Sequence, residues 1–101
     1  MHTETEAPSA YHVLLRRLLF LAKVYVTLKP AVNDPQGRTV LAGLKSLGFT
    51  SVKEVRAGKY IEVTVQGSSR IEAKAQVIEM CEKLLANPVL EEYSFELEDL
   101  A

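Results

Sequence analysis

Apolar and polar residues alternate along several stretches of the chain, a pattern typical of β-strands that bury one face. The clearest stretch is 23–29, where three aliphatic residues share one side and Pro30 follows. The stretches 60–65 and 89–97 show the same alternation. A shorter stretch, 52–57, predicts a further strand, which a hairpin turn joins to 60–65. The pattern therefore predicts four strands.

Two helices are predicted between these strands, because apolar residues there recur at helical spacing. The first begins at Asp34-Pro35, since Asp caps free backbone amides and Pro needs no hydrogen-bond partner at the first helical position. It ends at Gly48, which adopts the left-handed conformation readily. The second begins at Ser69, the first residue of a capping box, and ends before Pro88.

The order strand, helix, strand, strand, helix, strand predicts an α+β fold, the ferredoxin-like β-α-β-β-α-β sandwich. In that fold an antiparallel sheet carries both helices on one face. The other sheet face is then uncovered, and we expect it to meet a second copy of the chain.

The first 22 residues do not follow the strand and helix pattern. Residues 1–10 are small and polar, which predicts a disordered tail. Residues 11–22 are compatible with a short amphipathic helix or with an upstream extension. Arg16 and Arg17 interrupt their apolar run, so we predict neither a membrane span nor a signal peptide. We divide the chain into an extension or disordered segment, 1–20, and one domain, 21–101.

Composition and charge narrow the class of protein. The chain has 101 residues, of which 48% are apolar, so it forms one globular domain. Its formal net charge of −1 lacks the basic excess of a non-specific nucleic-acid binder. Residues 23–59 carry seven basic and two acidic side chains, and residues 60–101 three basic and nine acidic. This asymmetry favours oriented docking between proteins, unless the charges interleave in space and cancel.

No catalytic constellation is visible in the sequence. His2 and His12 have no cysteine or carboxylate partner at ligand spacing. The single cysteine, Cys81, cannot form an intrachain disulfide, which favours a reducing, cytoplasmic setting. It lies on an apolar stripe of the second helix with Ile71 and Ile78, so we interpret it as a small buried hydrophobic residue. We therefore expect no catalytic, cofactor or metal site in this chain.

Two short motifs are candidates for partner binding. In the first, Arg56 and Lys59 lie on either side of Gly58 at the predicted hairpin tip. They form either a solvated turn or a cationic docking point for an acidic partner surface.

The second motif is Asp34-Pro35-Gln36-Gly37. Helix capping explains Asp34 and Pro35. It does not explain Gly37, since glycine inside a helix costs up to about 1 kcal/mol relative to alanine. A close approach by another backbone would explain it.

Five segments, in order and with matching gaps, resemble the PurS family, the small subunits of the multi-subunit phosphoribosylformylglycinamidine synthase of purine biosynthesis. They are residues 23–29, 34–37, 44–49, 55–62 and 84–89. The resemblance covers about three-quarters of the chain. Two positions depart from the family pattern: Ala31 replaces a usual glycine, and Asn33 replaces a common apolar residue.

The resemblance implies a function that the residues alone do not. The complete enzyme is a cytoplasmic ligase that uses ATP and glutamine-derived ammonia to convert formylglycinamide ribonucleotide into formylglycinamidine ribonucleotide. ATP and magnesium belong to a large synthetase subunit, and ammonia release to a glutaminase subunit. The small subunit is non-catalytic, associates with itself as a segment-exchanged dimer or a tetramer, and bridges the other two subunits.

A second interpretation is a regulatory module of ferredoxin-like fold that binds a small metabolite. The two hypotheses differ in what stabilises the protein: a metabolite in one case, partner subunits in the other.

Overall fold

The structure, a computed structural model, describes residues 18–100 of the chain. Its elements, in chain order, are β1 (Leu18–Leu28), α2 (Pro35–Ser46), β2 (Gly58–Gly67), α3 (Arg70–Met80), the π-helical turn η1 (Cys81–Leu85) and β3 (Glu91–Asp99). The strands form one antiparallel sheet in the order β2-β1-β3, so β1 is central. The described chain is thus α+β, with three strands and two α-helices.

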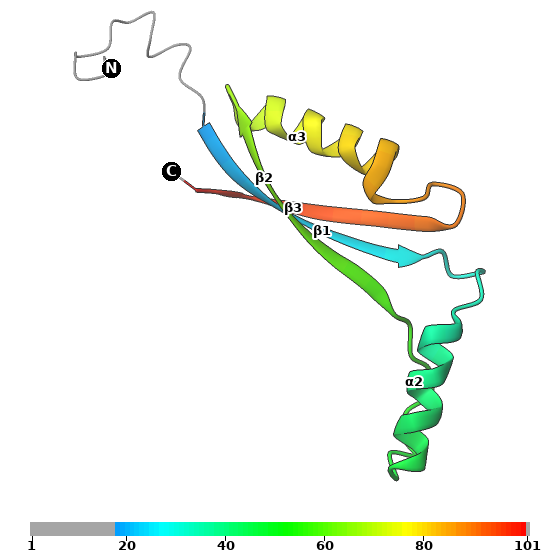
Figure 1. Ribbon diagram of the computed structural model, residues 1–101. Helices are drawn as coiled ribbons and strands as arrows, with labels where there is room; N and C mark the ends of the chain where they lie inside the picture. Colours follow the sequence, from blue (N-terminus) through cyan, green and yellow to red (C-terminus); the bar gives the residue numbers. More distant parts are fainter. Residues whose placement is uncertain (1–17, 101) are drawn as a thin grey trace, which may run out of the picture.

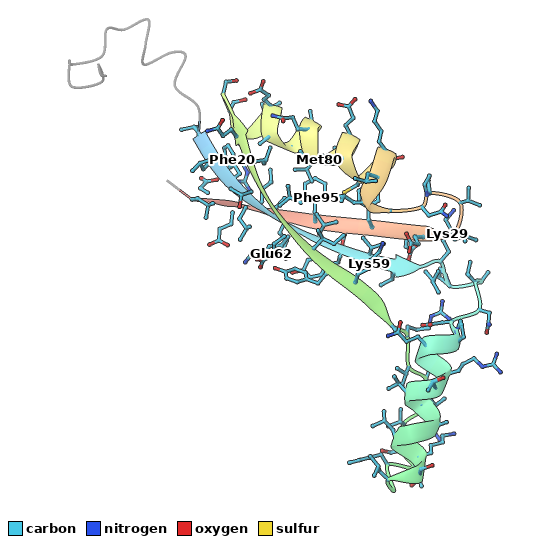
Figure 2. All side chains as sticks on the ribbon, in the orientation of Figure 1. Phe20, Lys29, Lys59, Glu62, Met80 and Phe95 are labelled. Atoms are coloured by element: carbon cyan, nitrogen blue, oxygen red, sulfur yellow. The ribbon has the colours of Figure 1, made fainter. Side chains whose placement is uncertain are left out.

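The core lies between the sheet and α3. Figure 1 shows α3 lying over one face of the sheet, while α2 projects beyond the end where β1 finishes and β2 begins. The sheet residues of this core are Phe20, Ala22, Val24, Val26 and Val65, and those of the helical layer are Ala73, Val77, Cys81 and Ala86. Met80 and Phe95 pack against this cluster at its margin (Figure 2). Alternation along β1 therefore directs one side of this strand into the core, as the sequence predicts.

The opposite face of the sheet is mainly polar, although Leu19, Tyr25 and Tyr60 are exposed on it. Lys23 lies beside Glu62 on β2 and Glu96 on β3, and its ammonium group pairs with Glu98 at 3.0 Å. Such a surface is the ordinary solvated side of an antiparallel sheet. Contact between this face and a second copy stays a prediction.

The predicted hairpin is wrong. Residues 52–57 form no strand, and β2 begins at Gly58, which lies opposite Thr27 of β1. A β-carbon at Gly58 would lie 2.4 Å from the carbonyl oxygen of Val26. Glycine is therefore required here for close packing against β1 and not for a turn.

The helix predicted as one alternative for residues 11–22 is also wrong where the structure describes it. Residues 18–22 belong to β1, with Phe20 and Ala22 buried on the core side. The apolar run of residues 18–22 was ambiguous in the sequence. A strand that is buried on one face and partly buried on the other shows no clear alternation of apolar and polar residues. The predictions for residues 1–17 lie outside the described residues.

The helix boundaries follow the predicted signals. Asp34 is the N-cap of α2, and Gly48 has a φ of 100°, the left-handed region that favours glycine. Ser69 caps α3 by accepting a hydrogen bond from the backbone amide of Glu72 at 3.1 Å. The apolar stripe predicted for the second helix is correct for Cys81, now at the start of η1, but wrong for Ile71 and Ile78. These two are 83% and 39% exposed because Ala73 and Val77 face the sheet instead.

Candidate partner-binding site

Asp34 is the centre of the predicted site. Its Oδ1 accepts a hydrogen bond from the amide of Gly37 at 2.9 Å, and its Oδ2 accepts one from the amide of Ala57 at 2.7 Å. The side chain thus joins the first turn of α2 to the segment that enters β2. The hydrogen bonds from Gly37 and then Ala57, together with the charge of Arg56, lower the pKa of Asp34. The residue is only 4% exposed, yet its carboxylate stays ionised because backbone amides solvate it.

Gly37 confirms the close backbone approach that its position predicts. A β-carbon there would lie 2.3 Å from the carbonyl oxygen of Val55 and 2.6 Å from Oδ2 of Asp34. Pro35 and Gln36 are exposed at the start of α2. The motif therefore divides into two buried residues that hold the chain together and two residues that face outward.

Arg56 binds this chain's own backbone. Its Nη2 donates hydrogen bonds to the carbonyl oxygens of Lys29 and Val32, both at 3.0 Å. Arg56 therefore connects the segment after α2 with the segment before it, and it does not project from a hairpin tip. Lys59 lies apart from it, exposed on β2 opposite Val26.

The structure thus brings together part of each predicted motif. We call the group formed by Asp34, Gly37, Val55, Arg56 and Ala57 the clasp. Sequence analysis found three of its members but not the contacts between them, because residues 34 and 57 are 23 positions apart. Partner binding by the predicted residues stays a prediction.

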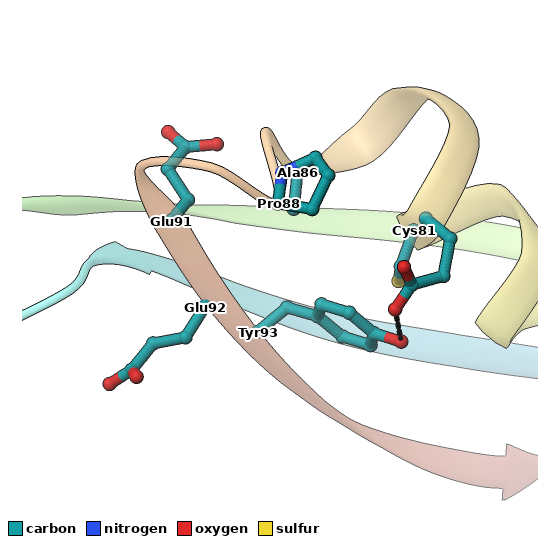
Figure 3. Close-up of a pocket in the computed structure, with 7 residues that line it drawn as sticks. Cys81, Ala86, Pro88, Glu91, Glu92 and Tyr93 are labelled. Atoms are coloured by element: carbon teal, nitrogen blue, oxygen red, sulfur yellow. Dashed lines mark hydrogen bonds between the residues drawn. The ribbon is translucent and has the colours of Figure 1, made fainter.

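A small hollow of about 240 Å³ lies between η1 and the start of β3. Figure 3 shows Cys81, Ala86, Pro88 and Tyr93 around it, with Glu91 and Glu92 at the strand. The phenol of Tyr93 donates a hydrogen bond to Glu82 at 2.8 Å.

Neither Tyr93 nor Cys81 is activated for chemistry in this hollow. The hydrogen bond to Glu82, with burial, raises the pKa of Tyr93 to about 12. Burial raises the pKa of the Cys81 thiol, which holds it protonated at neutral pH.

Among the described residues, no group of three or more His, Cys, Asp or Glu side chains is placed to hold a metal ion. In the same part of the chain, no helix is long and apolar enough to cross a membrane.

Comparison with known proteins points to one family. A family model described as "PurS: Phosphoribosylformylglycinamidine (FGAM) synthase" matches residues 21–99. The chain is 48% identical to the phosphoribosylformylglycinamidine synthase subunit PurS of Bacillus subtilis, over 81% of this chain and 96% of that protein. It is also 48% identical to the PurS subunit of Synechocystis, over 74% of this chain and 75% of that protein.

Solved structures agree with the sequence comparison. The C2 crystal form of Bacillus subtilis PurS matches with a TM-score of 0.71 and 48% identity, over 78% of this chain and 98% of that one. A chain in the structure of PurLQS from Thermotoga maritima matches with a TM-score of 0.71 and 36% identity, over 81% of this chain and 98% of that one.

Proposed function

The chain belongs to the PurS family of phosphoribosylformylglycinamidine (FGAM) synthase subunits, and on this premise we propose that it bridges a synthetase and a glutaminase subunit without performing chemistry itself. It is a subunit of this enzyme of purine biosynthesis. The observation that carries the proposal is the match to almost the whole of a chain in the PurLQS structure.

The proposal assigns the ligase chemistry, the ATP and the magnesium to the other subunits, in the cytoplasm. The chemistry of the described residues supports this division. Cys81 is a buried, protonated thiol and Asp34 is held by backbone amides, so neither is available as a nucleophile or general base. What the chain offers instead is surface for association.

We further propose that two copies associate by exchanging the arm, which we define as α2 with residues 47–57. The arm exposes apolar side chains: Leu47 is 76% exposed and Phe49 is 54% exposed. Ile71 on α3 is more exposed still. A segment that exposes apolar side chains to water is stabilised when a partner buries them.

Exchange restores the predicted architecture. If α2 of one copy packs beside α3 of the other, the sheet again carries two helices on one face. Residues 52–57, which the sequence predicts as a strand, then pair with an edge of the partner's sheet. Each copy thus receives from the other the second helix and the edge strand, because its own arm projects away from its own sheet.

The self-association can be tested by sedimentation of Leu47→Glu, which puts a charge into the proposed interface. The control is Lys45→Glu, an exposed polar position on the same helix. We expect dimers for the natural chain and the control, and weakened dimers for Leu47→Glu. A natural chain that sediments at its single-chain mass of 11.2 kDa across the micromolar range would contradict the exchange.

The bridging role is tested by sedimentation with the two partner subunits of the same organism. We expect all three to sediment together, and the synthetase and glutaminase to separate when this chain is omitted. Stable association of those two subunits without it would contradict the bridging role.

A further inference from the structure

Two connections join α2 to the sheet, and the second of them is also the last part of the arm. The first connection, residues 29–34, leads from β1 into α2, and the second connection, residues 50–57, leads from α2 into β2. Figure 1 shows that α2 extends from the sheet through these two segments alone. The direction of the arm therefore depends on how firmly the two connections hold each other.

Three hydrogen bonds link the two connections across the clasp. Nη2 of Arg56 donates to the carbonyls of Lys29 and Val32, and the amide of Ala57 donates to Asp34. A planar guanidinium that donates to two carbonyls fixes their positions relative to each other, which a flexible ammonium does less well.

Two further contacts lie beside these hydrogen bonds, one inside the clasp and one between the first connection and the chain before β3. The contact of Gly37 with Val55 sets how closely the first turn of α2 approaches the second connection. The amide of Lys29 donates a hydrogen bond to the carbonyl of Leu90 at 2.9 Å, just before β3. The first turn of α2 is therefore packed against the second connection, and the first connection is bound to the residue before β3.

We propose that the clasp fixes the direction of the arm relative to the sheet, and that this direction makes two copies close into a dimer instead of linking into open chains. The second half rests on the arm exchange proposed above. An exchanged segment closes a two-fold pair only if its angle suits both copies, and a variable angle permits open assemblies. A fixed arm also avoids the entropy cost of ordering it on association. Arg56 and Asp34 are thus positioning residues for assembly.

The direction of the arm can be measured as a distance between two spin labels. Labels at Ser46→Cys, near the end of α2, and Thr64→Cys, on the polar sheet face, report it within one chain. Cys81 is buried and escapes labelling in the folded protein. The labelled chain is diluted into an excess of unlabelled chain of the same variant, so that distances between copies do not contribute.

The test variant is Arg56→Met, and its control is Lys53→Met, which removes a charge from the same connection. We expect one narrow distance distribution for the natural chain and the control, and a broad one for Arg56→Met. We also expect Arg56→Met to raise the dissociation constant of the dimer by about tenfold or more, the effect of losing two hydrogen bonds. An equally narrow distribution with unchanged dissociation would overturn the proposal.

Two further outcomes are also decisive. If circular dichroism shows that Arg56→Met does not fold, Arg56→Lys is measured in its place. A distribution of spin-label distances in Arg56→Lys that is as narrow as that of the natural chain would again overturn the proposal. If the natural chain proves monomeric, the proposed arm exchange is wrong, and so is the inference that the arm's direction closes two copies into a dimer. The distances between the two spin labels still decide whether the clasp directs the arm.

Discussion

A β-carbon on Gly37 would lie 2.3 Å from the carbonyl oxygen of Val55, so the first turn of α2 packs against the chain entering β2 at a separation that only glycine permits. This contact lies at the base of the arm, where the clasp joins the two connections to each other. A glycine that sequence analysis could explain only by a close approach thus marks the junction on which the proposed assembly depends.

Gly37→Ala should destabilise the protein by about 1–3 kcal/mol, because either the backbone at Val55 or the cap at Asp34 must move. Urea unfolding followed by circular dichroism measures this loss. The matched control is Gly43→Ala in the same helix, where a β-carbon meets nothing within 4 Å. That change should raise stability by up to about 1 kcal/mol. Equal effects of the two changes would contradict the close packing.

Asp34→Asn should destabilise the protein in a way that depends on pH. Because the pKa of Asp34 is lowered in the folded chain, its contribution is present above the unfolded pKa of about 3.9 and is lost as pH falls through the folded pKa. The difference in unfolding free energy between the natural chain and Asp34→Asn should therefore be constant near neutral pH and shrink below about pH 4. A difference that stays constant down to pH 2.5 would show that the ionised carboxylate has no part in the cap.

Tyr93 should titrate well above the ordinary pKa of a tyrosine. Absorbance near 295 nm should show a component with a pKa of about 12 that disappears in Tyr93→Phe. Glu82→Gln should move that component towards the ordinary value of about 10, because it removes the charged acceptor. The raised pKa also means that this hydrogen bond contributes stability below pH 10 and loses it as pH rises towards 12. An unchanged titration in Glu82→Gln would contradict the contact.

Cys81→Ser should cost about 1–3 kcal/mol, because it places a hydroxyl group where a fully buried sulfur packs in the core. Thermal unfolding measures the loss. The thiol of the natural chain should react with a disulfide reagent only as fast as the protein opens. Rapid modification of the folded chain would show that the core is open at this helix.

The sequence predicted the features that depend on neighbouring residues. Asp34, Gly48 and Ser69 act where they were expected, because a cap or a left-handed residue depends only on the few residues beside it. The resemblance to the PurS family could likewise be recognised from short segments of the sequence, and the match to the family model confirms it.

The features that sequence analysis missed depend on distant parts of the chain. Gly58 was interpreted as a turn residue, but its requirement comes from the carbonyl of Val26 on another strand. Arg56 was predicted to lie at a hairpin tip, either as part of a solvated turn or as a docking point, yet it binds carbonyls 24 and 27 positions earlier in the chain. Nothing in the local sequence distinguishes an arginine that binds a backbone from one that faces solvent.

The bridging role is decided by comparing two nitrogen sources in one reconstituted enzyme. FGAM formation is measured with glutamine and, separately, with an ammonium salt, in the presence and absence of this chain. Omitting the chain should abolish the glutamine-dependent rate and affect the ammonium-dependent rate less, because free ammonia does not need to pass between subunits. The chain alone should hydrolyse neither glutamine nor ATP. A glutamine-dependent rate that is unchanged without the chain, or hydrolysis by the chain itself, would contradict a non-catalytic bridging subunit.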